Sequence, residues 1–159
     1  LLIDAFEEKY RIALEKLGPN SEESLYTIFT AHSIPSQSLE LGDPYSEEFD
    51  KTINKIVERV QPRKWFKAYQ SQGMIPVPWL GPTVESVLEK IAKQGSKKVL
   101  IVPVGFVCDH VEILFDIDIE FKKYASELKL SLHRTESLNI SPLFVEALAS
   151  LTWENLISP

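Results

Sequence analysis

Cysteine is almost absent from this sequence of 159 residues, in which Cys108 is the one cysteine. A single thiol excludes an internal disulfide framework, a cysteine-rich zinc site and a cysteine-ligated iron–sulfur cluster within this chain. Basic residues are also in the minority, since 17 Lys and Arg face 23 Asp and Glu and the net charge is -6. This balance argues against a nucleic-acid-binding protein and against attachment to anionic lipid by charge alone.

Three kinds of segment are missing as well. No apolar run approaches the roughly 18 residues that span a bilayer, and no secretory signal pattern opens the chain. No glycine-rich phosphate loop of the dinucleotide or the GKS/GKT type occurs, so nucleotide chemistry has no support. We expect an intracellular globular domain located in the cytoplasm, with peripheral membrane association left open.

The first residues of the chain already belong to a helical pattern. Leu1-Leu2-Ile3 contains no Met, and the apolar face that begins there continues to Leu17, where Gly18-Pro19 ends the helix. A chain that begins inside a helix is more naturally a fragment than a whole gene product. We therefore expect a missing portion on the N-terminal side.

Strand-like and helix-like segments alternate along the rest of the chain. The predicted strands cover 25–30, 65–69, 98–104 and 130–133, and the most hydrophobic of them, 98–104, should be central. The predicted helices cover 45–60 with Asp43 as N-cap, 82–94, 109–128, and 141–155 with Ser141 as N-cap. This alternation predicts an α/β fold with a doubly wound, mainly parallel sheet flanked by helices.

In such a sheet, ligands bind beyond the carboxyl ends of the strands. Three segments of this chain leave strands at that edge, namely 31–33, 71–73 with the proline-rich loop that follows, and 105–110. We expect the chemistry of the protein in these segments.

The predicted helix 109–128 carries a row of acidic residues. Glu112, Asp116 and Glu120 follow one another at i, i+4 and i+8 and line one ridge of an α-helix. The adjacent row is apolar and should face the core; it consists of Ile113, Ile117 and Phe121. The acidic row is either a solvated face or a set of oxygen ligands that conducts a divalent cation or holds protons.

Histidines and one stiff loop are further candidates. His32, at the end of a strand, is either a core or capping histidine or a proton acceptor or metal ligand that faces the cleft. His110 is expected to support its helix, and His133 to lie on the surface. Three prolines stiffen the loop 76–82, where Trp79 either packs in the core or forms a wall for a flat aromatic ligand.

Seven short motifs, taken together and in order, resemble the ferrochelatase family. They spread over almost the whole chain and correspond to the C-terminal half of the family's two-domain chain. The motifs are Thr30-Ala31-His32-Ser33-Ile34-Pro35, Gly42-Asp43-Pro44-Tyr45, Gln70-Ser71-Gln72-Gly73, Pro78-Trp79-Leu80-Gly81-Pro82, Val102-Pro103-Val104-Gly105-Phe106, Asp109-His110-Val111-Glu112 with Ile117-Asp118-Ile119-Glu120, and Glu136-Ser137-Leu138-Asn139.

The resemblance implies roles for individual residues. His32 matches the catalytic histidine, assigned either to pyrrole deprotonation or to metal handling, and Glu112 matches the carboxylate that faces it across the porphyrin cleft. Asp116 and Glu120 match an acidic ridge proposed to pass protons or metal. His110 matches a supporting position. The loops that carry Ser71 and Trp79 are the candidates for porphyrin contact.

The resemblance also implies a Rossmann-like, class II chelatase-like fold, in which 1–140 form the C-terminal chelatase domain and 141–159 a helix that packs toward the missing N-terminal domain. The implied reaction is insertion of Fe²⁺ into a porphyrin without ATP and without a cofactor. The stretch 136–139 favours protoporphyrin over coproporphyrin. The fragment alone should be inactive and should self-associate. Two alternatives stay open, a porphyrin- or haem-binding domain without turnover and a related cobalt chelatase.

Overall fold

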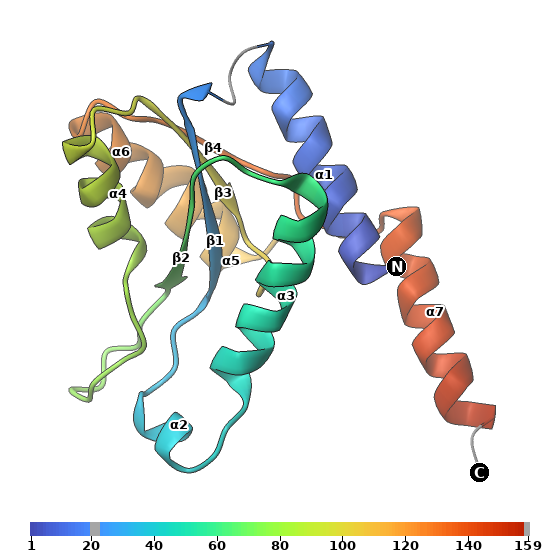
Figure 1. The fold of residues 1–159 in the computed structure, drawn as a ribbon. Helices are drawn as coiled ribbons and strands as arrows, with labels where there is room; N and C mark the ends of the chain where they lie inside the picture. Colours follow the sequence, from blue (N-terminus) through green and yellow to red (C-terminus); the bar gives the residue numbers. More distant parts are fainter. Residues whose placement is uncertain (20–22, 158–159) are drawn as a thin grey trace.

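A four-stranded parallel sheet forms the centre of the protein (Figure 1), as seen in a computed structural model that describes residues 1–19 and 23–157. Within these residues the strands are β1 (Leu25–His32), β2 (Trp65–Gln70), β3 (Lys98–Val102) and β4 (Ser131–Arg134). They lie in the order β2-β1-β3-β4, and every neighbouring pair is parallel. The predicted α/β fold with a parallel sheet is confirmed, and the strand at 98–102 is an inner strand as expected.

Helices cover both faces of this sheet. The faces are distinguished by their cores: α1 and α3 pack over Phe29 of β1, whereas α4, α5, η2 and α6 pack over Ile28 on the opposite side. The helices are α1 (Leu2–Leu17), α2 (Gln37–Glu40), α3 (Tyr45–Val60), α4 (Val84–Lys93), α5 (Val111–Leu114), η2 (Asp116–Phe121), α6 (Lys122–Glu127) and α7 (Pro142–Ile157). The doubly wound arrangement is therefore confirmed.

The two cores explain why the inner strands read as continuous apolar runs. Successive side chains of a strand point to opposite faces, and here both faces are covered, so Ile28 and Phe29 are both completely buried. Each such side chain contributes roughly 1.5–3 kcal/mol to folding. The strands and their two helix layers thus form a rigid support for the loops at the carboxyl edge.

One helix starts later than predicted, and two others start as predicted but without the predicted side-chain cap. The helix expected from Pro82 begins at Val84, with Thr83 as N-cap, because the Pro82 carbonyl accepts a hydrogen bond from Tyr69 N (2.8 Å) and keeps this stretch beside β2. Asp43 does not occupy the N-cap position of α3, although its Oδ1 accepts from Tyr45 N at 2.9 Å. Among the described residues the buried Ser141 hydroxyl has no partner, so it does not cap α7.

The uninterrupted α-helix predicted for 109–128 is wrong. The segment is divided into α5, the π-helix η2 and α6. The amide of Glu120 donates to the Phe115 carbonyl five residues back (3.0 Å), which is the π-helical pattern. The predicted apolar row is nevertheless buried, since Ile113 and Ile117 are fully enclosed and Phe121 is 5% exposed.

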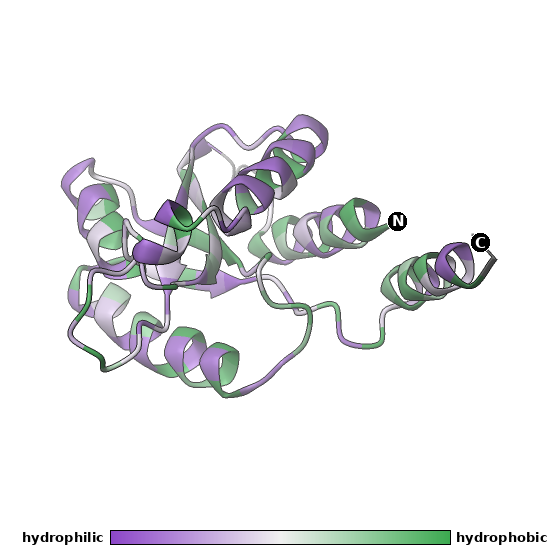
Figure 2. Cartoon of the chain, turned by 90° about the horizontal axis from the view of Figure 1, so that it is seen from below, coloured by the Kyte–Doolittle hydropathy of each residue, from purple (hydrophilic) through white to green (hydrophobic). Residues whose placement is uncertain are grey.

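Helix α7 lies apart from the sheet and packs against α1 (Figures 1 and 2). It is mostly apolar, yet many of its large side chains face outward: Val145, Leu148, Leu151, Trp153 and Leu156. Burial of an apolar face is the usual source of helix stability in proteins, and this face is uncovered here. In the part of the chain that the structure describes, no helix has the length and apolar character needed to cross a membrane.

Candidate functional site

The loop that follows β3 comes into close contact with β1 at the carboxyl edge of the sheet. Gly105 N donates to the Thr30 carbonyl at 3.0 Å, and a Cβ added at Gly105 would lie 2.7 Å from both Cα and Cβ of Ala31. Only glycine permits this approach. The chain turns from one side of β1 to the other between β2 and β3, and such a reversal point is where open α/β sheets bind ligands.

His32 and Glu112 face each other at this edge. His32 ends β1, Glu112 lies in the first turn of α5, and His32 Nε2 is 3.4 Å from Glu112 Oε1. Both side chains are about one-third exposed, at 35% and 36%. The two residues that the resemblance matched to a catalytic histidine and its facing carboxylate therefore meet in space, with access to solvent.

The orientation of the His32 ring is fixed from behind. Its Nδ1 lies 2.5 Å from the Ser33 carbonyl oxygen, which can only accept, so we assign the proton to Nδ1. In the neutral ring, Nε2 then carries a lone pair that points at the Glu112 carboxylate. Tyr45 supports the same residue, because its hydroxyl donates to the His32 carbonyl (2.9 Å) and burial raises the pKa of that phenol. Two acceptors that face each other at this distance suit a shared proton or cation.

Two residues hold the backbone of Glu112. Gln70, which is 2% exposed at the end of β2, donates from Nε2 to the Glu112 carbonyl at 2.9 Å. His110 accepts from the Glu112 amide at Nδ1 (3.3 Å) and is the N-cap of α5, as the predicted supporting role requires. The sequence analysis quoted Gln70 within a motif but assigned it no role, because an inward-facing glutamine at the end of a strand leaves no sequence signal.

The loop after β2 contributes the next part of the edge. The Ser71 hydroxyl donates to Asp116 Oδ2, which brings a predicted loop residue to a predicted relay residue. Trp79 is partly exposed, and its indole lies where a Cβ on Gly73 would stand (2.7 Å from Cη2). Neither residue is fully buried, so Trp79 is not enclosed in the core, and its role toward a ligand stays a prediction.

The predicted acidic row has different surroundings along its length. Asp116 is half-buried beside Ser71, whereas Glu120 is exposed and lines a hollow of about 280 Å³ with Glu85, Lys123 and Tyr124. Among the described residues, no group of three or more His, Cys, Asp or Glu side chains is placed to hold a metal ion. His32 and Glu112 thus form a pair, and a bound cation would need further ligands from elsewhere.

His133 is partly buried on β4 rather than fully on the surface, and it bonds Ser131 Oγ at 2.9 Å. Burial, together with the neighbouring charges of Lys98 and Lys122, lowers its pKa. His133 lies on the outermost strand β4, which β3 separates from β1, so it is not part of the His32–Glu112 site.

Comparison with known proteins identifies the family. A protein-family model described as Ferrochelatase matches residues 1–156. The chain belongs to the ferrochelatase family. A ferrochelatase from Deinococcus radiodurans is 38% identical over 151 residues, which cover 94% of this chain and 48% of the relative. A protein named coproporphyrin III ferrochelatase, from Geobacillus thermodenitrificans, is 34% identical over 152 residues, with 95% and 48% covered.

This ferrochelatase-family chain therefore spans about half the length of the curated relatives it matches. Its fold is also that of a shorter protein. A crystal structure described as a cobalamin (vitamin B12) biosynthesis CbiX protein from Marinobacter aquaeolei superimposes with a TM-score of 0.60 at 17% identity, covering 83% of this chain and 97% of the other. At that identity the likeness shows a common fold.

Proposed function

We propose that this chain is the C-terminal half of a ferrochelatase and supplies one wall of a cleft in which Fe²⁺ enters a porphyrin. The observation that carries the proposal is the His32–Glu112 pair, held at 3.4 Å on the carboxyl edge of the sheet in a chain of this family. The stretch Glu136-Ser137-Leu138-Asn139 leads us to favour protoporphyrin IX, although a relative named for coproporphyrin III is also similar to the chain.

The reaction defines what the residues must do. One Fe²⁺ replaces two pyrrole N–H protons, so the products are haem and two protons, and no electron transfer or ATP is required. The porphyrin must be distorted to expose its nitrogen lone pairs, and binding energy from the rest of the macrocycle can drive this distortion. A base near neutral pKa must then accept protons on one face.

His32 is suited to be that base. Its Nδ1–H is held by the Ser33 carbonyl, so Nε2 offers its lone pair toward the cleft. Glu112, opposite Nε2, would stabilise the imidazolium that forms when the proton arrives. The same pair can present Fe²⁺ as substrate, since imidazole and carboxylate bind it without the retention expected of a thiolate site.

The remaining predicted residues have supporting roles in this proposal. Asp116 and Glu120 lie on η2, the first half-buried and the second exposed, and in this proposal they would carry protons away from the cleft or metal toward it. Ser71, which donates to Asp116, and Trp79, farther along the same loop, would contact the porphyrin. A flat ligand and a partly exposed indole fit each other by stacking.

The opposite wall of the cleft must come from outside this chain. We expect the 159-residue chain alone to give no turnover, and its exposed α7 face to cause self-association. Size-exclusion chromatography together with a zinc insertion assay tests both points. Turnover by a monomer of this chain would contradict the half-site interpretation.

The main test is zinc insertion into protoporphyrin by the complete gene product. We expect His32→Ala and Glu112→Ala to lower turnover by about 10²–10⁴-fold, the range of acid–base catalysis. His133→Ala and Glu58→Ala are the matched controls, because one is a histidine outside the cleft and the other an exposed glutamate on α3. Both controls should keep turnover within about twofold.

The outcomes separate the functions. Loss of turnover with porphyrin binding retained in the two site variants supports the proposal. Porphyrin binding without turnover in the wild-type protein, with protoporphyrin and with coproporphyrin, would make it a binding protein instead. Insertion of Co²⁺ into a tetrapyrrole that is not a porphyrin, in preference to zinc into protoporphyrin, would favour a cobalt chelatase.

A further inference from the structure

We infer that Arg134 is a positioning residue for the site: it ties together the two ends of the segment 109–118, which carries His110, Glu112 and Asp116. The expected effect on catalysis rests on the proposed function, whereas the contacts of Arg134 do not depend on it. Arg134 ends β4, on the opposite side of β3 from His32, and it touches none of the residues assigned to catalysis. Nothing in the sequence analysis singled it out.

The first contact of Arg134 is with the π-helix. Its Nη2 donates to Asp118 Oδ2 at 2.8 Å and its Nε donates to Asp118 Oδ1 at 3.2 Å, which makes a two-pronged pair. The Arg134 side chain is 13% exposed and that of Asp118 is 24% exposed, so the pair is largely screened from water. Lys122 adds a second cation to Asp118 at 3.1 Å.

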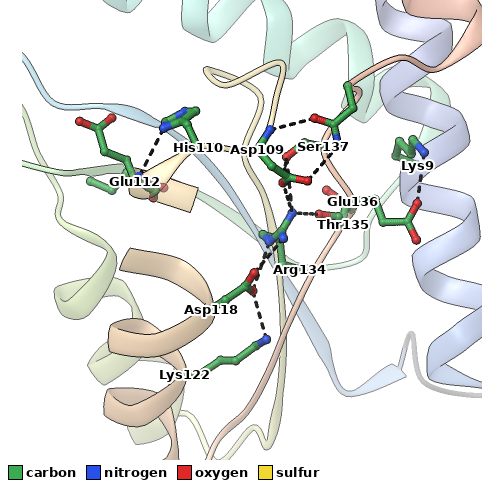
Figure 3. A network of polar contacts seen from close by, with 12 residues as sticks. Lys9, Asp109, His110, Glu112, Asp118, Lys122, Arg134, Thr135, Glu136 and Ser137 are labelled. Atoms are coloured by element: carbon green, nitrogen blue, oxygen red, sulfur yellow. Dashed lines mark hydrogen bonds and ion pairs between the residues drawn. The ribbon is translucent and has the colours of Figure 1, made fainter. Parts of the chain in front are cut away.

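The second contact is with the loop that precedes α5 (Figure 3). Arg134 Nη1 lies 3.4 Å from Asp109 Oδ1, and the Ser137 hydroxyl donates to the same oxygen at 2.7 Å. Asn139 completes the contact from both sides, because its Nδ2 donates to Asp109 Oδ2 and its Oδ1 accepts from Asp109 N, each at 2.9 Å. We call Asp109, Asp118, Arg134, Ser137 and Asn139 the Arg134 cluster.

Both carboxylates of the cluster are held in the ionised form. Burial alone would raise the pKa of Asp109, but hydrogen bonds from Asn139 and Ser137 and the charge of Arg134 outweigh it and lower that pKa. Burial also acts to raise the pKa of Asp118, and Arg134 and Lys122 together lower it. One guanidinium therefore lies between two negative charges that belong to two different ends of the same segment.

The segment needs such an external support because its own helices are weak. Helix α5 is a single turn of four residues, and the π-helix η2 begins one residue later, after Phe115. A single turn cannot form on its own, since the nucleation of a helix is unfavourable. Exposed apolar side chains on this segment, among them Val111 at 70% and Phe115 at 45%, leave it with packing on one side only.

A shift of the segment would act directly on the reacting pair. Asp109 directly precedes His110 in the chain, and His110 accepts a hydrogen bond from the Glu112 amide. Glu112 in turn faces His32. Partners that orient a reacting group from behind typically change activity by about 10- to 100-fold when they are removed. Arg134 can supply this orientation because its rigid planar fork presents separate N–H groups to two carboxylates, whereas the compact ammonium of a lysine lacks this two-pronged geometry.

The test measures zinc insertion by the complete gene product with Arg134→Met and Arg134→Lys. We expect Arg134→Met to lower kcat by about 10- to 100-fold while the KM for porphyrin stays within about threefold, because the binding walls are unchanged. Arg134→Lys should recover only a small part of this loss. Arg59→Met is the matched control: Arg59 also joins two carboxylates, Asp4 and Glu7, but it does so between α1 and α3.

A double variant separates positioning from simple stabilisation. In Asp118→Leu/Arg134→Met the Asp118 charge disappears together with its partner, and Asp109 keeps Ser137 and Asn139, so the melting temperature should return toward that of the wild type. The link that Arg134 makes between the two ends of the segment 109–118 is still missing, so kcat should remain low. Recovery of kcat in parallel with the melting temperature, or an Arg134→Met variant with wild-type kcat, would overturn the inference.

Amide hydrogen exchange makes the inference independent of the proposed function. Arg134→Met should speed exchange in 109–118 and leave α4 (Val84–Lys93) unchanged, whether or not the wild-type protein inserts metal. Unchanged exchange in 109–118 would overturn the inference. A wild-type protein without turnover, but with faster exchange in Arg134→Met, would remove the proposed function and leave the positioning role of Arg134 standing.

Discussion

Two clusters of polar residues lie on the same edge of the sheet and are built in opposite ways. His32 and Glu112 are each about one-third exposed, and within the described residues the Glu112 carboxylate has His32 as its one partner. The carboxylates of the Arg134 cluster are instead bonded on both oxygens, by Arg134, Lys122, Ser137 and Asn139 (Figure 3). The difference indicates which groups are free to exchange protons or cations and which ones hold the backbone in place.

The contrast has a simple physical basis. A carboxylate that already accepts several hydrogen bonds loses them if it takes up a proton or a metal, so it is a poor carrier. The Glu112 carboxylate and the His32 imidazole can take up a proton or a cation between them without breaking other side-chain hydrogen bonds of the carboxylate. The loop 105–110 connects the two clusters along the chain, because it carries Asp109 and leads into α5, where Glu112 lies. The predictions below test how far the two clusters can be separated.

The largest effect should come from Gly105→Ala, which disturbs both clusters at once. The new Cβ would lie 2.7 Å from the backbone of Ala31, so β1 and the loop must move apart. We expect the free energy of unfolding to fall by about 1–3 kcal/mol, as for other overpacked sites, and zinc insertion to be lost. Urea unfolding measures the first effect, with Gly81→Ala as control because its nearest neighbour is at 3.8 Å. A variant as stable as the wild type would contradict the close contact.

Removing one member of each cluster should separate stability from activity. Arg134→Met removes the guanidinium that two partly buried carboxylates share, although Asp118 keeps Lys122 and Asp109 keeps Ser137 and Asn139. The change should lower the free energy of unfolding by about 1–3 kcal/mol. His32→Ala removes an accessible ring and should cost less than about 1 kcal/mol. The effects on turnover are expected in the reverse order. Guanidinium unfolding of the two variants checks this ranking, and a less stable His32→Ala than Arg134→Met would refute it.

A smaller effect is expected at Gln70, which donates a hydrogen bond to the backbone of Glu112. Gln70→Met removes the hydrogen bond to the Glu112 carbonyl but keeps the volume, so stability should fall by about 0.5–1.5 kcal/mol. The Glu112 backbone would then be held by the His110 cap and by its own helix. Gln72→Met, at an exposed position in the next loop, is the control and should change nothing measurable. Equal stability of both variants would show that this hydrogen bond carries no weight.

Periodicity predicted most of this fold because both helix layers and the inner strands bury their apolar faces. Ile113, Ile117 and Phe121 face the core as the spacing predicted, although the helix that carries them is not a continuous α-helix. A π-helical turn adds one residue to a hydrogen-bonded ring, and no residue type marks it. The same limit applies to Pro82, which suits a first helical turn but is held beside β2 instead.

The candidate site was accessible to sequence reasoning where its residues follow strands. His32, Ser71 and the segment that begins at Asp109 all leave the carboxyl edge, and the sheet order brings them together. Arg134 could not be found in this way. Its importance lies in contacts with two residues far from it along the chain, and a lone arginine at the end of a short edge strand has no pattern of its own.

The smallest predicted effect concerns acid, and its sign follows from the two lowered pKa values. Because the pKa of Asp109 and that of Asp118 are lower in the folded protein than in the unfolded chain, their ionised forms stabilise the fold above the ordinary aspartate range. That contribution is lost as the pH falls through the folded-state values, below about pH 4. The difference in stability between wild type and Arg134→Met should therefore shrink in acid. Other carboxylates with lowered pKa values, such as Asp4 and Glu136, occur in both proteins and cancel from the difference. Urea unfolding of the two proteins from neutral pH down to about pH 3 measures it, and a constant difference would show that the Arg134 cluster stabilises the protein by packing rather than by charge.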